Sequence, residues 1–319
     1  MPEHIDALLT NISVAHIQTQ DKYIATKVFP IIPVTKQSGL YLKYKQEDWF
    51  RDEAQKRADS TESAGSGYEV GSDSYRADVY AFHKDVGDQI KQNSDVPLQP
   101  LADAARFVAG RMLIRQERQF VSDYLKTGVW GTDLTGVAGV PGAGQFRQFD
   151  ELGTSDPILT VEDVKDTISR KTGFDANTAV LGSDVYKVLK NHPDIADRIK
   201  YTSSENVTLD LVARLLEIDR VFVMKSIFNT APEGKAGTYD YNFAKDLWVG
   251  HVADAPGLLT PSAGYTFAWD GVSDGQGLTI GTTQFRMQNL RADRVESQSA
   301  WDNKIVAPEL GVYLSAVVK

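Results

Sequence analysis

The chain has 319 residues, of which 42% are hydrophobic and 24% charged, a balance typical of globular rather than disordered proteins. It contains no cysteine, which excludes disulfides and thiolate metal sites. The net charge of −9 disfavours a dedicated nucleic-acid-binding protein, because an acidic surface repels a polyanion, although a wall that encloses DNA stays compatible with it. We expect no membrane span and no secretory signal, since no long apolar stretch occurs and the first residues lack a basic cluster.

Residues 1–38 are predicted to form an extended arm. The segment around Phe29 and Ile31 is apolar and contains Pro30 and Pro33, which exclude a helix and disfavour a central strand. Its apolar side chains must be buried somewhere. We predict that Phe29 and Ile31 contact a neighbouring subunit, and packing on the chain's own domain is the alternative.

Residues 39–86 are predicted to hold two strands joined by a long loop. The segments 40–45 and 74–82 carry the β-branched and aromatic residues typical of strands, whereas the residues between them are polar, charged and rich in glycine and serine. A connection of this length without its own core is rare within a compact domain, so we expect a neighbouring chain to hold it. The candidate contact residues in this region are Tyr41, Tyr44, Trp49, Phe50, Arg51, Tyr68 and Tyr75.

A long helix is predicted over residues 101–127, where apolar side chains largely keep helical spacing. Arg111, Arg115 and Arg118 fall on related faces of this helix. They could contact DNA, but a neighbouring subunit or Glu117 of the same helix is the partner that the spacing favours.

Residues 128–157 are predicted to form a glycine-rich loop, and the remainder to be mixed α and β structure with a strand-rich C-terminal part. Thr160 resembles a helix start, and Thr208 a helix cap. The predicted helices are 160–172, 184–191 and 209–218, and the predicted strands are 178–181, 220–224, 247–252, 265–269, 278–289, 294–301 and 312–318.

The segment Gly271-Val-Ser273-Asp-Gly275 matches the pattern around a hydrolase nucleophile. That chemistry requires a strand-to-helix turn, whereas here strands are predicted on both sides, so we interpret the segment as a turn. The five histidines lack metal-binding spacing, and the chain lacks a glycine-rich phosphate-binding motif. We therefore predict no catalytic residue, no cofactor and no metal site.

The order of these elements resembles the Hong Kong 97-type major capsid proteins of tailed bacteriophages. The resemblance covers most of the chain, and its most similar segments are Asn177–Tyr201, Leu211–Val223, Pro261–Trp269 and Glu309–Leu314. It implies an α+β capsid fold with an N-terminal arm (1–38), an extended two-stranded loop (39–86), a peripheral domain (87–159) with a spine helix (101–127), a mixed α/β axial domain (160–260), and C-terminal strands (261–319) that return to the peripheral domain.

The resemblance also implies a function as a structural protein and not as an enzyme. Such a subunit self-assembles through pentamers and hexamers into the icosahedral head shell of a virion, in the bacterial host cytoplasm, around double-stranded DNA contacted without specificity. Separate scaffolding, portal and decoration proteins would be its further partners. The alternatives are an encapsulin-like compartment with protein cargo, another phage structural protein such as a tail component, and a serine hydrolase using Ser273.

Overall fold

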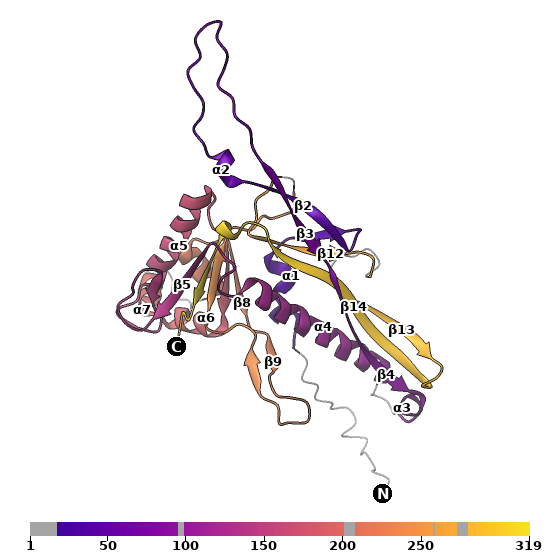
Figure 1. The fold of residues 1–319 in the computed structure, drawn as a ribbon. Coiled ribbons are helices and arrows are strands. Elements are labelled where there is room, and N and C mark those ends of the chain that lie inside the picture. Colours follow the sequence, from indigo (N-terminus) through magenta and orange to yellow (C-terminus); the bar gives the residue numbers. More distant parts are fainter. Residues whose placement is uncertain (1–17, 95–98, 201–207, 258, 273–279) are drawn as a thin grey trace.

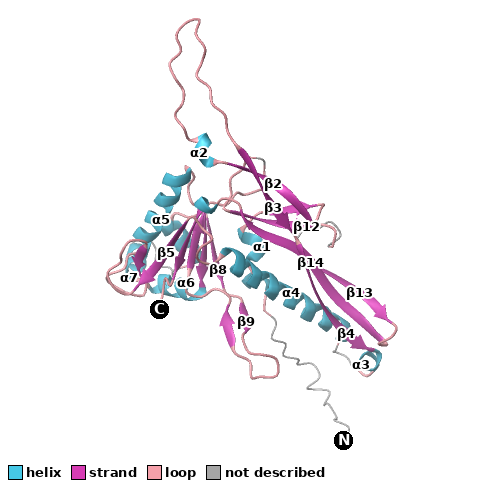
Figure 2. Cartoon of the chain, in the orientation of Figure 1, coloured by secondary structure: helices cyan, strands magenta, loops and turns pink. Residues whose placement is uncertain are grey.

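The computed structural model describes residues 18–94, 99–200, 208–257, 259–272 and 280–319 (Figure 1). The chain has two units, each built on a β-sheet: one lies at an end of a long helix, and the other runs alongside that helix (Figures 1 and 2). One loop projects far from both units. The helical elements are η1 (Gln20–Lys22), α1 (Ala25–Val28), α2 (Gln46–Trp49), α3 (Asp88–Gln92), α4 (Pro100–Tyr124), α5 (Pro157–Thr172), α6 (Ser183–Asn191), α7 (Pro193–Lys200), α8 (Leu209–Leu216) and η2 (Pro308–Leu310).

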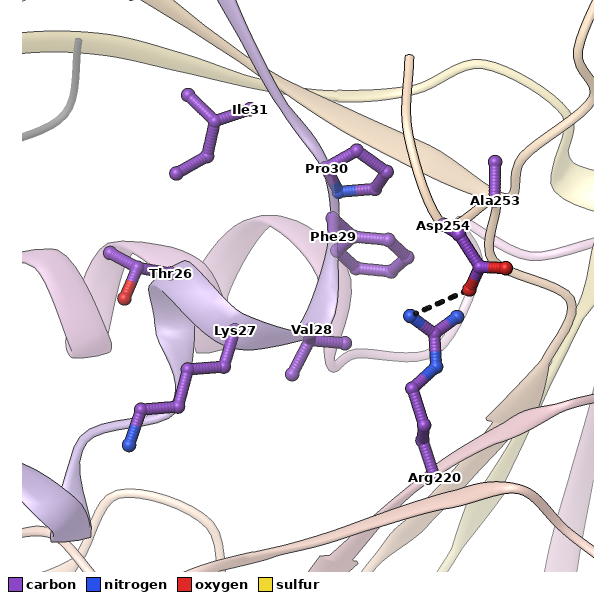
Figure 3. A pocket seen from close by; sticks show the side chains of 9 residues that line it. All are labelled: Thr26, Lys27, Val28, Phe29, Pro30, Ile31, Arg220, Ala253 and Asp254. Atoms are coloured by element: carbon purple, nitrogen blue, oxygen red, sulfur yellow. Dashed lines mark ion pairs between the residues drawn. The ribbon is translucent and has the colours of Figure 1, made fainter.

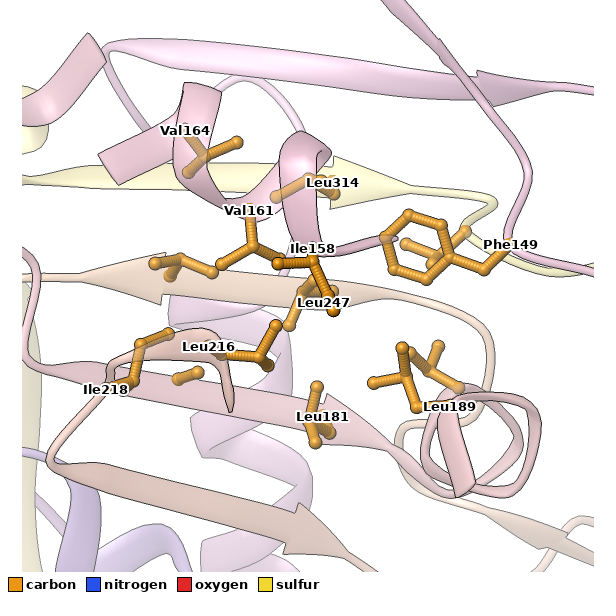
Figure 4. Close-up of a cluster of buried hydrophobic side chains, with 14 of the residues drawn as sticks. Phe149, Ile158, Val161, Val164, Leu181, Leu189, Leu216, Ile218, Leu247 and Leu314 are labelled. Carbon is orange, nitrogen blue, oxygen red and sulfur yellow. The ribbon is translucent and has the colours of Figure 1, made fainter. Parts of the chain in front are cut away.

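The first unit is a six-stranded sheet with the strand order β6-β5-β15-β11-β7-β8. Helices α5, α6 and α8 pack on it around a core of aliphatic side chains that includes Ile158, Leu181 and Leu247 (Figure 4). Its strands are β5 (Thr132–Val137), β6 (Gln145–Arg147), β7 (Thr178–Gly182), β8 (Arg220–Met224), β11 (Leu247–Gly250) and β15 (Gly311–Ser315).

The second unit is a five-stranded sheet centred on a long strand, β14 (Ala292–Ile305). Trp301 of β14 pairs with β4 (Asp78–Gly87) on one side and with β12 (Gly264–Trp269) on the other. Strands β4 and β12 therefore lie on opposite sides of β14. Helix α4 packs along β14 and β4. The remaining strands are β1 (Ile31–Val34), parallel to β12 at one edge, and β13 (Gly281–Met287).

Two small hairpins complete the described structure. The strands β2 (Ser38–Tyr44) and β3 (Val70–Arg76) pair with each other and carry the projecting loop. The strands β9 (Ile227–Asn229) and β10 (Tyr239–Tyr241) form the second hairpin, beside the six-stranded sheet, which the sequence pattern did not predict.

Several predicted boundaries are wrong, each for a local reason. Helix α5 begins at Pro157 rather than at Thr160, because the carboxylate of Asp156 accepts the amides of Ile158 and Leu159 at 3.1 and 3.0 Å. The predicted strand 74–82 is two strands, since β3 ends before Ala77 and β4 then pairs in a different sheet. The spine helix ends at Tyr124 rather than at residue 127.

The expected division of the chain also differs from the sheet membership. Strands β5 and β6 lie in the predicted loop 128–157, yet they belong to the six-stranded sheet. Strand β15 inserts between β5 and β11 of that sheet, so the segment 261–319 does not return as a whole to the other unit. Glycine makes this possible at position 136, where a Cβ atom would lie 2.1 Å from the carbonyl oxygen of Ala316.

Within the described ranges, no helix combines the length and apolar character needed to cross a bilayer. In the same ranges, histidine, aspartate and glutamate side chains form no group of three or more that could hold a metal ion.

Candidate inter-subunit surface

The β2–β3 hairpin has two different faces. On the inner face, Tyr41 and Tyr75 stack on Phe267 of β12, with ring centroids 5.4 and 4.6 Å apart. Tyr41 also donates a hydrogen bond to Asp73 across the hairpin, at 3.1 Å. These contacts fix the base of the hairpin on its own subunit. Tyr41 and Tyr75 were predicted to contact a neighbouring subunit, and the structure instead places both rings against the five-stranded sheet of their own subunit.

The outer face of the hairpin is apolar and uncovered. Leu40 and Leu42 alternate with Tyr41 along β2, and they remain 72% and 63% exposed. Across the hairpin they pair with Ser74 and Ser72, which are too small to cover them. Exposed leucines on a strand with one face already packed are typical of a surface that meets another chain. The sequence analysis missed both residues, although the two-residue alternation of β2 identifies them once Tyr41 faces inward.

An aromatic cluster lies where the projecting loop leaves the hairpin. Tyr44, Trp49 and Tyr68 have ring centroids between 5.6 and 6.0 Å apart. Trp49 and Tyr68 are nevertheless 53% and 60% exposed. An ion pair between Lys45 and Glu69 joins the two chain segments at the point where the loop begins and ends. The prediction brought these three aromatic residues into one candidate surface, and the structure places them side by side.

Helix α2 rests on the end of α5. The side-chain amide of Gln46 donates to the carbonyl of Lys171, one of the carbonyls that an α-helix leaves without a partner at its end. The ring of Phe50 lies beside Gly173, where a Cβ atom would be 3.7 Å away. Phe50 still exposes 63% of its surface. The loop is therefore anchored at both ends on its own subunit, and its remaining surface is free.

Residues 52–67 project away from both sheets (Figure 1) and are exposed throughout. In this described loop the hydrogen bonds join loop residues to one another, as between Arg57 and the carbonyl of Thr61. Arg51 at its start approaches Asp48 and Glu53 at 3.6 and 3.8 Å. The segment has neither a core of its own nor a body of this chain to pack on.

The prediction that Phe29 contacts a neighbouring subunit is wrong. Phe29 is buried in the core that joins α4 to the six-stranded sheet, with its ring 4.4 Å from that of Tyr124 and 5.3 Å from that of Trp248. The alternative, packing on its own domain, is correct for this residue. Ile31 is half-buried against the small cluster of Met112, Ala268 and Trp301 in the five-stranded sheet.

A shallow pocket of about 220 Å³ lies beside this part of the arm (Figure 3). Residues 26–31 line one side, and an ion pair of 3.5 Å between Arg220 and Asp254 lies on the other. Arg220 also donates to the carbonyl of Val252 at 2.7 Å. Arg220 and Asp254 are thus engaged with each other, and Lys27 is the remaining charged side chain that lines the pocket.

A serine, a histidine and an aspartate do meet in the structure, at Ser155, His192 and Asp194. The Oγ of Ser155 lies 3.1 Å from Nε2 of the buried His192. Nδ1 of His192 accepts the backbone amide of Asp194, so the ring proton is on Nε2 and the imidazole donates to the serine. A hydrolase requires the opposite, a histidine that accepts the serine proton. Burial lowers the pKa of His192, which favours the neutral ring. The hydrogen bonds of this group connect three segments of the chain. Ser273, the candidate from the sequence motif, lies outside the described residues.

Comparison with known proteins identifies this architecture. No family model matches the chain. The major capsid protein of Burkholderia phage BcepMu is 25% identical over 230 residues, which are 70% of each chain. A phage-related protein of Bordetella bronchiseptica superposes with a TM-score of 0.67 at 19% identity, over 94% of both chains.

Two assembled particles share the fold. The capsid of the cyanophage P-SCSP1u matches with a TM-score of 0.64 at 8% identity, over 98% of this chain and 93% of that one. The SrpI encapsulin of Synechococcus elongatus matches with a TM-score of 0.55 at 11% identity, over 98% and 95%. The chain has the Hong Kong 97-type capsid fold and is a homologue of phage major capsid proteins.

Proposed function

We propose that the chain is the subunit of an icosahedral head shell, assembled through pentamers and hexamers in the host cytoplasm around double-stranded DNA. The observation that carries this proposal is the projecting loop with its uncovered apolar base, formed by Leu40, Leu42, Trp49, Phe50 and Tyr68. Monomeric proteins rarely expose a contiguous apolar surface next to a long unpacked loop. Neighbouring copies of the same chain would cover both.

In such a shell each unit has its own task. The six-stranded sheet with its helices would be the axial domain, which meets its copies around the five-fold and six-fold axes. The five-stranded sheet with α4 would be the peripheral domain, and the β2–β3 hairpin would be the extended loop that overlies a neighbour. The same sequence must fit both pentamers and hexamers. The two sheets would therefore keep their shape, while the loop would adapt to the different angles between neighbouring subunits.

Each contact between subunits would contribute only a modest free energy, and a shell would be held together by many of them. Full burial of one leucine contributes about 1.5–3 kcal/mol, so the outer face of the hairpin alone gives a modest contact. A subunit held by several such contacts is retained strongly, because losing one contact does not release it. The role is structural and needs no catalytic group. Separate scaffolding, portal and decoration proteins would act on the surfaces that the shell leaves free.

Electron microscopy of the purified chain tests this function. We expect closed particles from the wild-type chain and none from a variant in which residues 52–67 are replaced by a short Gly-Ser linker. Replacing the exposed residues 139–143 in the same way is the control, which should still form particles. Thermal unfolding of both variants shows that the subunit is folded. Normal particles from the loop variant would contradict the role of the loop.

An encapsulin-like compartment is the second candidate, supported by the similarity to the SrpI encapsulin over nearly the whole chain. The 25% identical relative is a phage protein, which favours the head shell. The two functions differ in their contents. Nuclease-resistant DNA in particles purified from the natural source supports the head shell, whereas a co-purifying enzyme inside the particles supports the compartment.

A further inference from the structure

The exposed face of α4 carries arginine and no acidic side chain between residues 104 and 122. Its exposed positions include Arg106, Arg111, Arg115 and Arg118. Arg106 approaches Asp103 at 3.7 Å. The other three form a stripe at positions i, i+4 and i+7, which share one side of a helix. This stripe stands on a chain whose net charge is −9.

The three arginines of the stripe lie against aromatic rings. The guanidinium of Arg111 is 5.2 Å from the ring centre of Phe107, that of Arg115 is 4.9 Å from Tyr80, and that of Arg118 is 4.3 Å from Phe228. Within the described residues none of the three forms an ion pair; Arg115 hydrogen-bonds the neutral amide of Gln119. A ring orients a guanidinium but leaves its positive charge in place.

Glu117, which with a neighbouring subunit was one of the two partners expected from the sequence, is turned away from the stripe. Its carboxylate is buried and accepts the amide of Ile24 at 3.0 Å and that of Ala25 at 2.9 Å, with the hydroxyl of Ser226 at 3.3 Å. It holds the arm onto the helix instead of neutralising the arginines. The prediction of an intrahelical pair with Glu117 is therefore wrong.

The uncompensated stripe has a physical cost, because like charges one turn apart destabilise a helix. A polyanion laid along the helix would remove that cost. Arg111 and Arg118 are separated by roughly 10 Å along the axis, at a rise of about 1.5 Å per residue. Double-stranded DNA carries one charge per about 1.7 Å, so about six phosphates fall within that length.

We propose that the stripe of Arg111, Arg115 and Arg118 binds the phosphate backbone of double-stranded DNA without sequence preference, and that this face of α4 is turned toward the particle interior. The orientation rests on the proposed head-shell function. The binding itself does not, since it is a property of the subunit. The net charge of the chain is −9, so its surface taken as a whole repels DNA, and this favours attachment through a local basic stripe.

The test is a titration of the unassembled full-length chain with a fluorescein-labelled 30-base-pair duplex of random sequence, followed by anisotropy at several NaCl concentrations. The variant replaces the three arginines by glutamine. Each neutralised phosphate contributes a salt slope of about 0.9, so we expect the slope to fall by about 2.7 and the affinity to fall at least about tenfold.

Two matched variants make the result specific. Replacing Lys187, Lys190 and Arg214, which are exposed on the unit of the six-stranded sheet, by glutamine removes the same charge and should leave affinity and slope unchanged. Replacing the three arginines by lysine keeps the charge and should retain most of the binding. Circular dichroism verifies that α4 is intact in each variant.

Wild-type affinity and slope in the glutamine variant would overturn the proposal. A variant that binds DNA normally but fails to assemble would also overturn it, and would assign the stripe to an acidic surface of a neighbouring copy. If the wild-type chain forms no closed particles at all, the head-shell function fails, whereas loss of DNA binding in the variant would still support the stripe as the binding face.

Discussion

The ring of Tyr75 lies flat on that of Phe267, with centroids 4.6 Å and planes 6° apart, and the same tyrosine covers Gly39 on the paired strand. A Cβ atom at position 39 would lie 2.8 Å from the hydroxyl oxygen of Tyr75. Glycine at this position therefore lets the tyrosine reach Phe267. This contact joins the base of the β2–β3 hairpin to β12.

Gly39→Ala should loosen the hairpin without unfolding the subunit. The added methyl group displaces Tyr75 and removes a stacked pair worth about 1 kcal/mol, so local opening becomes about fivefold more populated. Trypsin cleavage after Lys43 and Lys45 measures this opening. Gly71→Ala is the control, because its Cβ atom meets only the carbonyl oxygen of Lys43 at an ordinary 3.5 Å. Equal cleavage rates in both variants would show that the stacking does not hold the hairpin.

Leu42→Ser and Trp49→Ala should reduce particle yield while leaving the free subunit intact. Both side chains are mostly exposed in the subunit, so Leu42→Ser should change its free energy of unfolding by no more than about 0.5 kcal/mol. Trp49→Ala also removes ring contacts with Tyr44 and Tyr68, which should cost about 1 kcal/mol and leave the subunit folded. Sedimentation velocity gives the assembled fraction, and urea unfolding gives the subunit stability. Val140→Ser, at an exposed residue in the loop between β5 and β6, should assemble normally. Unchanged assembly in the first two variants would remove these residues from the interface.

Arg286→Gln should weaken the far end of the five-stranded sheet at neutral pH more than at acid pH. Hydrogen bonds from Arg286 and Lys91 hold the pKa of Asp88 far below its usual range, and those from Lys91 and Arg286 lower the pKa of Asp293. A lowered folded-state pKa gives stability that is present above the ordinary aspartate pKa of 3.8 and is lost as pH falls below it.

Urea unfolding at pH 7 and pH 3 measures this difference. We expect the difference in free energy of unfolding between wild type and the Arg286 variant to be smaller at pH 3 than at pH 7. At pH 7 the same difference should also decrease in high salt, because these side chains are partly exposed. Lys235→Gln, which removes one exposed charge elsewhere, should show no such dependence. A gap that is constant across pH would mean that the ion pairs do not contribute.

Glu117→Gln should remove a loss of stability that the wild-type chain shows as pH rises, which is the opposite of the pH dependence expected for Asp88 and Asp293. Burial raises the pKa of Glu117 despite the hydrogen bonds from the arm. A raised folded-state pKa gives stability that is fully present below the ordinary value of 4.5 and is lost as pH rises through the folded value. Lys27 on the arm and Tyr23 beside it are the charged or titratable groups that influence this carboxylate.

The wild-type chain should therefore lose stability relative to the glutamine variant as pH rises above 4.5, measured as the free energy of unfolding in urea. Glu162→Gln, in the first turns of α5 and exposed, is the control and should follow the wild-type profile. Parallel profiles for wild type and the Glu117 variant would show that the buried carboxylate is not the source of the dependence.

Elements with a local signal could be predicted from the sequence. Strand β8 was predicted with its bounds correct, Gly173 ends α5 in a left-handed conformation, and the hydroxyl of Thr208 accepts the amide of Leu211 as a helix cap. In each case a few neighbouring residues decide the structure, through a run of β-branched side chains or through a cap.

What the sequence did not indicate depends on distant partners. Strands β5 and β6 lie in a glycine-rich segment and become strands because β15, far away in the chain, pairs with β5. Phe29 is buried because Tyr124 and Trp248 form a site for it. The role of Glu117 was mistaken for the same reason, since its partners Ile24 and Ala25 lie 93 and 92 residues earlier in the chain.

Strand β15 lies between β5 and β11, in the interior of the six-stranded sheet, although every other strand of that sheet precedes it in the sequence. During translation the sheet remains split, with β5 and β6 on one side of a gap and β11, β7 and β8 on the other, until residue 315 has left the ribosome. The sheet can therefore be completed only after its other five strands have been made, so a partly synthesised chain lacks the finished sheet that neighbouring copies would bind.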